Sequence, residues 1–426
     1  MTTARDIESC PLHEVDTFDP EFLQDPHPYY RRLREEAPVF RDPKNGIVYV
    51  STYELVMEAL ARPLVFSNRF GAQLRAGAVT GDVSEEEMAA AAEGYQPADT
   101  MLTADPPEHT RYKKLAGRAF TYKKVMAMND YVETIVNELL DAFAADGRCE
   151  FKSQFANLLP MYVICDALGF PREDRDRFRE WSDAFTLQLS GMANAEQRVW
   201  CARKIVEAQH YFLDICEQRR AEPREDICTD LVQERLEEED GSTRPLTPEE
   251  LISIIQQILV AGNETTSHTL TTGIYYLLTN PAEFDKLKAD PSLIENFVEE
   301  SLRMLTPTNN MWRVATEDTE IGGVEVKKND LLLLRFGSAN RDEAKFPDAD
   351  TFDIERENAK DQLAFGAGVH LCLGQQLARK EMQKAFPMVL ARLQNLQLVD
   401  PPESFRYVPS ILLRGVQKLE LTFDPA

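Results

Sequence analysis

The sequence predicts a mainly α-helical protein with a minor β region. Apolar residues recur at helical spacing over long stretches, most clearly at 194–220, 248–279 and 375–393. Short apolar runs bounded by turn residues gather at 313–335 and predict a small amount of sheet. Because neither a repeat nor a break in composition divides the 426 residues, we expect a single domain over residues 1–426, with 1–24 as an N-terminal arm.

The first hundred residues predict short elements. They are a helix at 29–36, two hairpin strands at 39–40 and 47–51 around Lys44-Asn45-Gly46, and a helix at 53–61. The pattern then weakens over 66–103, which contains several glycines and an acidic, alanine-rich patch at 85–93. A mobile segment over a pocket and an irregular surface loop are equally compatible with this stretch.

The middle of the chain predicts a series of helices. Pro106 lies in the first turn of one of them, and Thr247 caps another that begins at Pro248. This very long helix, 248–279, ends before Pro281 because the residue preceding a proline disfavours helix. Further helices are expected at 124–146, 151–168, 174–189, 194–220, 281–289 and 293–305, and a short helix followed by an acidic turn is expected at 225–240.

The C-terminal third combines short strands with one long irregular segment. Strands are expected near 313–316, 320–321, 324–326 and 331–335, and a final hairpin at 396–399 and 418–423. The segment 340–363 is rich in Phe, Pro and Asp. An irregular segment of this length in a compact domain usually serves a function.

Charge and cysteine usage exclude several classes of protein. A net charge of -25 argues against nucleic-acid binding, which needs a basic surface. No apolar run reaches the ~18 residues of a membrane span, and the polar N-terminus lacks a signal segment, so we expect a soluble, cytoplasmic protein. The seven cysteines lack Cys-x-x-Cys spacing and are expected to be free thiols.

The segment 365–374 carries the strongest chemical signal. Gly366 and Gly368 allow the backbone to bend and to approach a flat partner closely. Cys372 opens the predicted final helix, and a helix N-terminus favours the thiolate, which is the metal-binding form. A thiolate covered by the ring of Phe365 suits a haem iron.

Other interpretations of this segment are a glycine-rich turn before a core helix with a buried cysteine, and a zinc module using His370 and Cys372. A dinucleotide-binding loop fits poorly, because Leu371 stands where the third glycine would be.

The segment matches the haem-binding signature of the cytochrome P450 monooxygenases at Phe365, Gly366, Gly368, His370, Cys372 and Gly374. The chain resembles soluble bacterial members of this family over 26–423. The resemblance implies the cytochrome P450 fold, a triangular helix-rich single domain with small antiparallel sheets. It also implies haem b (iron protoporphyrin IX) with Cys372 as the metal ligand, and a monomer.

The long helix contains an unfavourable stretch at its centre, with Gly262 and two threonines. The resemblance implies an opened turn here, with Ala261 beside the haem. Thr265 would hydrogen-bond dioxygen, and Glu264, where the family often has Asp, would relay protons. His268, one turn beyond Glu264, is expected at the surface or supporting the site rather than binding iron.

Two groups of charged residues have structural or cofactor roles by resemblance. Glu300 and Arg303 would be a simple surface pair by spacing alone. The resemblance makes them a buried pair, completed by Arg356, that fixes the segment beneath the haem. The expected contacts of the haem propionates are Arg313, His370, His109 and Lys113. Lys113 replaces a common arginine of the family, and Arg111 could act in its place.

The resemblance also indicates a substrate pocket and an electron donor. The pocket would be lined by Met101, Leu102, Leu187, Val260, Asn310, Met311, Ile411 and Leu412, which suits a terpenoid, steroid, fatty acid or aromatic molecule. A ferredoxin would dock on a basic proximal face formed by Lys113, Lys114, Arg118, Lys123, Lys124, Arg379, Lys380 and Lys384, unless these are ordinary solvated helix faces.

The predicted function is therefore a haem-thiolate monooxygenase that hydroxylates a hydrophobic small molecule with dioxygen and electrons from a separate ferredoxin and its reductase. The alternatives are a peroxide-driven haem peroxygenase and a haem-binding carrier or sensor that does not oxidise. The Glu264–Thr265 pair argues against both.

Overall fold

The computed structural model describes residues 10–71, 73, 83–118, 120–190, 192–238 and 240–425. The chain divides into two compact units, and each is described by itself. Unit 1 contains Met1–Phe66, Ala127–Pro160 and Thr265–Ala426, and unit 2 contains Ser67–Met126 and Met161–Glu264. Three helices run through a boundary: α7 (Tyr122–Ala127), whose last residue lies in unit 1, α9 (Leu158–Leu168) and α13 (Pro248–Thr279). The single domain with an arm over 1–24 stays a prediction.

Unit 1 begins with helices and strands of which the sequence predicts all except the last one. They are α2 (His27–Glu36), β1 (Val39–Arg41), β2 (Val48–Val50), α3 (Tyr53–Ala61) and β3 (Phe66–Ser67), which ends one residue inside unit 2. Thr52 caps α3 by accepting a hydrogen bond from the Leu55 amide. β1 and β2 pair antiparallel around the predicted turn, so the hairpin is confirmed.

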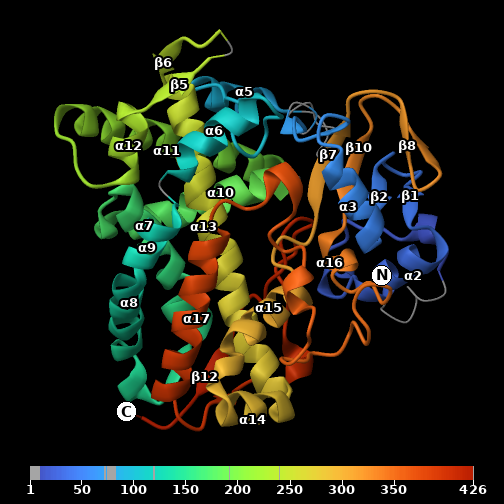
Figure 1. Cartoon of the computed structure of the whole chain (residues 1–426), viewed down its shortest axis with the longest axis vertical. Coiled ribbons are helices and arrows are strands. Elements are labelled where there is room, and N and C mark those ends of the chain that lie inside the picture. Colours follow the sequence, from blue (N-terminus) through green and yellow to red (C-terminus); the bar gives the residue numbers. More distant parts are fainter. Residues whose placement is uncertain are drawn as a thin grey trace. The chain divides into compact units, whose positions relative to one another are not determined.

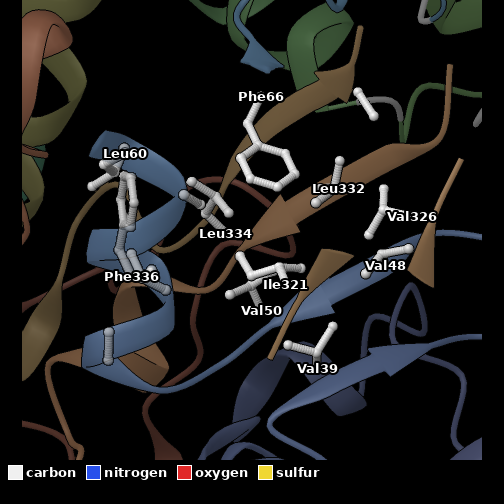
Figure 2. Close-up of a cluster of buried hydrophobic side chains, with 14 of the residues drawn as sticks. Val39, Val48, Val50, Leu60, Phe66, Ile321, Val326, Leu332, Leu334 and Phe336 are labelled. Carbon is white, nitrogen blue, oxygen red and sulfur yellow. The ribbon is translucent and has the colours of Figure 1, made fainter. Parts of the chain in front are cut away.

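A five-stranded sheet of order β1-β2-β10-β7-β3 brings distant segments together. β10 (Leu331–Leu334) pairs parallel with β2 and antiparallel with β7 (Met311–Ala315). Figure 2 shows a buried cluster of apolar side chains on this sheet, in which Leu334 lies near Leu60 of α3, while Val48 lies beside Val326 at the other end of the cluster. Burial of this apolar surface stabilises the sheet.

The remaining helices and strands of unit 1 include the predicted ones together with a strand at Arg148–Glu150 and a short helix at Phe336–Ala339, which were not predicted. They are α8 (Asn129–Asp141), β4 (Arg148–Glu150), α14 (Pro281–Ala289), α15 (Ile294–Leu305), β8 (Thr319–Ile321), β9 (Val324–Val326), α16 (Phe336–Ala339), α17 (Gln375–Arg392), β11 (Gln397–Leu398) and β12 (Glu420–Thr422). β12 pairs antiparallel with β11, which confirms the C-terminal hairpin, and also with β4. The predicted irregular segment 340–363 contains only one short 3-10 turn, Ala359–Asp361.

Unit 2 is largely helical. Its elements are α5 (Glu85–Ala92), α6 (Glu108–Gly117), α7 (Tyr122–Ala127), α10 (Arg175–Ser190), α11 (Ala195–Ala221), α12 (Ile227–Gln233), β5 (Arg235–Glu237) and β6 (Thr243–Pro245). The last residue of α7, Ala127, lies in unit 1, and the longer helices α9 (Leu158–Leu168) and α13 (Pro248–Thr279) also cross a boundary; α13 has the predicted bounds. The mainly α fold with small, mostly antiparallel sheets is therefore confirmed.

Four local predictions differ from the structure. The expected helix over 124–146 is interrupted at Met128 and forms α7 and α8. The acidic patch inside the weak stretch 66–103 forms α5, capped by Ser84, while residues 72 and 74–82 of that stretch lie outside the described residues. A π-helical turn, Lys152–Ala156, precedes α9. The acidic turn after α12 forms the β5–β6 hairpin, which residue patterns did not reveal.

The helix that follows the cysteine segment, α17, lies beside α15 and α8 (Figure 1). The C-terminal half of α13 approaches the same layer through Gly273, where a Cβ would lie 2.6 Å from Phe386 Cζ and 3.4 Å from Phe297 Cζ. A glycine is needed here for space, although it weakens the helix. The close approach anchors the C-terminal half of α13.

The inner face of α17 buries one carboxyl group. Glu381 is 3% exposed, and no hydrogen-bond partner reaches its Oε2 atom among the described residues. Burial raises the pKa of Glu381 well above its ordinary value. The folded protein therefore keeps this carboxyl group protonated at a pH where the unfolded chain ionises it.

We expect Glu381→Gln to stabilise the protein increasingly as pH rises. A raised pKa in the folded state means that the wild type loses stability above the ordinary pKa of glutamate, by about 1.4 kcal/mol per pH unit while the folded carboxyl stays neutral. Denaturant unfolding at pH 5, 6, 7 and 8 measures this. The exposed Glu35 provides the control, Glu35→Gln, which should follow the wild-type profile. A constant difference between Glu381→Gln and wild type across the range would contradict the explanation.

Among the described helices, none combines the length and the apolar composition that crossing a membrane requires.

Candidate functional site

The segment 365–374 forms a tight turn before α17. Gly366 and Gly368 both have φ +67°, a left-handed conformation that favours glycine. A Cβ on Gly368 would also lie 3.0 Å from the Leu60 carbonyl oxygen. The turn is closed by the Cys372 amide, which donates to the Phe365 carbonyl oxygen at 2.9 Å. The two glycines are therefore required by backbone conformation, as expected.

Cys372 lies ahead of the helix rather than inside it. The first residue of α17 is Gln375, and Gly374 is its N-cap residue. The prediction that Cys372 opens the helix is therefore wrong by about one turn, because the two glycines and the 3-10 turn Gly368–His370 carry the chain into α17. The amides of the first turn of α17 still face this end of the helix.

The residues present fit a haem held through sulfur. Cys10 and Cys372 are partly exposed, whereas the other five cysteines are buried. Burial raises the pKa of three of those thiols, Cys149, Cys165 and Cys201, which makes them poor thiolates. Two apolar residues close to Cys372 in the chain are exposed to solvent: Val369 is 39% and Leu371 is 38% exposed. A reachable sulfur in an apolar, glycine-bent turn has the donor chemistry of a haem-thiolate centre.

Phe365 is fixed from one side by a cation. The Arg379 guanidinium stacks over its ring at 4.4 Å, and Arg379 Nη2 donates to Glu299 Oε2 at 3.1 Å. Gln362 Nε2 donates to the same carboxylate at 3.1 Å. The Arg379 side chain is only 19% exposed. This arginine, which we expected on a docking face, therefore holds the ring that flanks Cys372.

The centre of α13 carries the predicted oxygen site. Ala261 is exposed and Glu264 and Thr265 are partly exposed, whereas the next residues along the helix, Thr266 to Leu270, are buried. The helix is continuous from Pro248 to Thr279, so the expected opened turn is not found. The hydroxyl of Thr269 bonds back to the Thr265 carbonyl oxygen at 2.9 Å, which satisfies a polar group within the helix.

Of the expected propionate contacts, two lie in unit 1. Arg313, in β7, is 3% exposed and donates through Nη1 to the Trp312 carbonyl oxygen at 2.6 Å. His370, in the 3-10 turn before Cys372, is partly exposed. Both residues belong to the unit that contains Cys372.

The other two expected contacts lie in unit 2, on α6. His109 is 3% exposed, and burial lowers its pKa to about 4, with Lys113 lowering it further and Asp105 opposing. A neutral His109 would reach a carboxylate as an N–H donor rather than as a cation. Arg111 pairs with Glu238 at 3.3 Å, so Lys113 stays the cationic candidate on this helix.

The structure joins Glu300, Arg303 and Arg356 in one buried network. Arg303 Nε donates to Glu300 Oε2 at 2.7 Å, and Arg356 Nε donates to Glu300 Oε1 at 3.2 Å. Arg303 Nη1 also donates to the carbonyl oxygens of Asn340 and Ala349, at 2.8 and 2.7 Å. The interpretation as an exposed pair is excluded, since Glu300 and Arg303 are 0% exposed. The network holds the long irregular segment through its backbone carbonyls.

The expected pocket residues of unit 1 lie together. Ile411 and Leu412 are buried, and the Leu412 carbonyl oxygen accepts hydrogen bonds from the Asn309 and Asn310 amides at 2.7 and 3.2 Å. Met311 follows at the start of β7. Among those of unit 2, the Leu102 amide donates to Gln257 Oε1 at 2.9 Å, one turn before Val260 on α13. No contact described here places Met101 or Leu187 beside them.

Three of the expected docking residues of unit 2 are paired with acidic residues of the same unit. Lys114 lies 3.9 Å from Glu237 and Lys124 lies 2.8 Å from Asp230, and Arg118 pairs with Glu234. Lys384, in unit 1, pairs with Glu133 at 3.1 Å. The local positive charge is therefore partly compensated. Sequence reasoning missed this because the partners are 106 to 251 positions away.

Comparison with known proteins points in the same direction as this site. The family model described as cytochrome P450 matches residues 47–423. A steroid C26-monooxygenase of Mycobacterium tuberculosis is 35% identical over 416 residues, which cover 97% of this chain and 98% of that protein. A vitamin D(3) 25-hydroxylase of Pseudonocardia autotrophica is 33% identical over 413 residues, covering 96% of both.

Solved structures show the same similarity. The crystal structure of CYP109E1 from Bacillus megaterium in complex with testosterone matches with a TM-score of 0.81 and 28% identity, covering 95% of this chain and 99% of that chain.

Proposed function

This chain belongs to the cytochrome P450 family and is a monooxygenase, and we propose that it hydroxylates a steroid-like hydrophobic molecule using haem b and electrons from a ferredoxin. The observation that carries the proposal is the partly exposed Cys372 in its glycine-bent turn. The names of the two relatives and the bound testosterone of the related structure support the substrate class.

The residues of unit 1 would hold the cofactor as follows. Cys372 would bind the iron as thiolate, and Arg313 and His370 would contact propionates. The chemistry of dioxygen activation and C–H oxidation comes from the bound haem iron. Phe365, braced by Arg379, would cover the sulfur and keep water from it.

Two neighbouring side chains of α13 would handle protons. The Thr265 Oγ1 hydroxyl would donate a hydrogen bond to the dioxygen substrate, and the Glu264 carboxylate would accept protons from solvent and pass them on. The overall reaction consumes dioxygen, two electrons and two protons, adds one oxygen atom to a C–H bond and releases one water. Both side chains are partly exposed, as a proton path requires.

The proposal is tested by a substrate screen followed by isotope labelling. Testosterone and vitamin D3 are titrated against the purified ferric protein, and shift-inducing compounds are turned over under isotope-labelled dioxygen with a ferredoxin and its reductase. We expect one labelled atom in each product molecule. Thr265→Ala should lower product formed per dioxygen consumed by about tenfold, the effect of losing one strong hydrogen bond.

Thr265→Ser keeps the hydroxyl and is the matched control, expected to retain most of the coupling. Label that enters from water instead of dioxygen would contradict the proposed reaction. Equal coupling in Thr265→Ala and wild type would contradict the role of the hydroxyl.

The docking face of an acidic ferredoxin is proposed on α6 and α7. Lys114 and Lys124 form exposed ion pairs with Glu237 and Asp230. Exposed ion pairs contribute little to stability, so acidic side chains of a partner protein can replace these two carboxylates. Local charge governs association rates more than affinity.

Charge reversal of Lys114 and Arg118 to Glu should therefore slow reduction by ferredoxin, and more so as salt is lowered, because screening weakens at low ionic strength. Stopped-flow reduction rates across a salt series measure this. Arg172→Glu is the control. It also reverses one positive charge in unit 2, at an arginine that pairs with Asp166 and is not part of the proposed docking face, and it should leave the reduction rates near wild type. Rates that equal the wild type at all salt concentrations would refute docking on this surface.

A further inference from the structure

A histidine on α13 is buried close to the predicted oxygen site. His268 follows Thr265 by three residues and is 1% exposed, so the surface position, one of the two that were expected, is excluded. Its ring occupies the space in front of Gly415, where a Cβ would lie 2.1 Å from His268 Nδ1 and 2.2 Å from Cγ. The φ of Gly415 is not in the left-handed region, so glycine is required at this position for space rather than for backbone conformation.

A lysine contacts Val416, the residue that follows Gly415 in the chain. Lys152, in the π-helical turn Lys152–Ala156, is 9% exposed and donates through Nζ to the Val416 carbonyl oxygen at 2.8 Å. A buried ammonium group needs such an acceptor. Burial, and then the charge of Lys152, lower the pKa of His268 well below its ordinary value. His268 is therefore neutral near pH 7 and is a fixed packing surface for Gly415.

The chain between residues 411 and 416 is held on its other side as well. The Arg414 amide donates to the Pro307 carbonyl oxygen at 2.9 Å, and Thr308 and Leu413 form an antiparallel bridge. The Leu412 carbonyl oxygen accepts from Asn309 and Asn310. The segment is thus clamped between 307–310 on one side and the pair His268–Lys152 on the other, all within unit 1.

We propose that His268 is a positioning residue for the substrate, which sets Ile411 and Leu412 relative to Thr265 by packing against Gly415. This role rests on the proposed function, in which Ile411 and Leu412 line the pocket and Thr265 acts on dioxygen. One rigid helix carries both the hydroxyl and the ring, about 4.5 Å apart along its axis at 1.5 Å per residue. The position of the pocket wall is thereby tied to that of the reacting centre.

The test compares two probes of the ferric haem protein by spectral titration. Imidazole is small, so its affinity depends on access to the iron alone. 4-Phenylimidazole is larger, so its affinity also depends on contact with the pocket wall. His268→Ala should lower the affinity for 4-phenylimidazole by about tenfold relative to the affinity for imidazole. This is the usual size of the coupling between contacting residues. Gly415→Ala should do the same by displacing the ring. The double variant His268→Ala/Gly415→Ala should recover most of the wild-type ratio, because the added methyl group fills the space that the ring vacates.

Gly273→Ala is the matched control. Gly273 lies on α13, as His268 does, but an added methyl group there would crowd Phe386 and not Gly415. It should lower the unfolding temperature without changing the probe ratio. Should Gly415→Ala fail to fold, Lys152→Met tests the clamp from the other side and should shift the ratio in the direction of His268→Ala.

Four outcomes decide the proposal. A shifted ratio in the single variants that is restored in the double variant supports it. A ratio that stays constant while the unfolding temperature falls would make His268 a packing residue only, and would overturn the proposal. Equal weakening of both probes would place the defect at the haem and also overturn it. A wild-type protein that gives no spectral response to imidazole would contradict the proposed function, and with it the role of His268.

Discussion

Replacing Cys372 by alanine should abolish the red-shifted absorption band that a thiolate-bound ferrous haem gives with carbon monoxide. The sulfur is the one proposed bond between this chain and the iron, and alanine supplies no donor atom. We expect haem content to fall as well, because the remaining proposed contacts would be only to the propionates and the ring surface. Difference spectra of the reduced protein with carbon monoxide, together with extracted haem per polypeptide, measure both effects.

Cys10→Ala is the control, since Cys10 is the other partly exposed thiol among the described residues. It should keep the full band. A band of wild-type position and intensity in Cys372→Ala would remove the basis of the proposed function, and a loss of the band in both variants would show that Cys372 has no special role.

Replacing Glu300 by glutamine should cost about 3–5 kcal/mol of unfolding free energy, the usual effect of removing one partner of a buried ion pair. Glutamine keeps the shape of the side chain but leaves Arg303 and Arg356 without a counter-charge. Both arginines hold backbone carbonyls between Asn340 and Thr351, so the irregular segment should loosen at the same time. Denaturant unfolding followed by circular dichroism measures the loss, and hydrogen exchange locates it.

Glu217→Gln removes an acidic partner at the same three-residue spacing, because Glu217 pairs with Arg220. The side chain of Glu217 is 67% exposed, and such pairs contribute at most about 1 kcal/mol. We therefore expect the control to stay near wild type. Equal losses in the two variants would show that burial is not what makes the Glu300 network important.

Local patterns predicted the helices well where the chain provides its own start and stop signals. The bounds of α3, α13 and α14 agree with the expectation, and each begins beside a capping threonine or a proline in the first turn. The prediction failed where a helix contains no such punctuation: the break at Met128 and the π-helical turn before α9 depend on what the helices contact.

The roles of individual charged residues were predicted less well. Arg379 was expected to face a partner protein, yet it holds Phe365 and Glu299. Lys114 and Arg118 were expected to be available, yet they pair with glutamates. A side chain with a long, flexible stem can reach several partners, and only the folded chain selects one of them.

By itself, the sequence determined that this is a helical protein with a glycine-bent turn around Cys372 at 365–374, because glycine conformations and helix starts are properties of neighbouring residues. Tertiary structure alone decided that His268 faces Gly415, that Lys152 reaches Val416, and that Lys114 and Arg118 pair with glutamates. Those contacts join positions more than a hundred residues apart, and the energy of each depends on burial that no local pattern records.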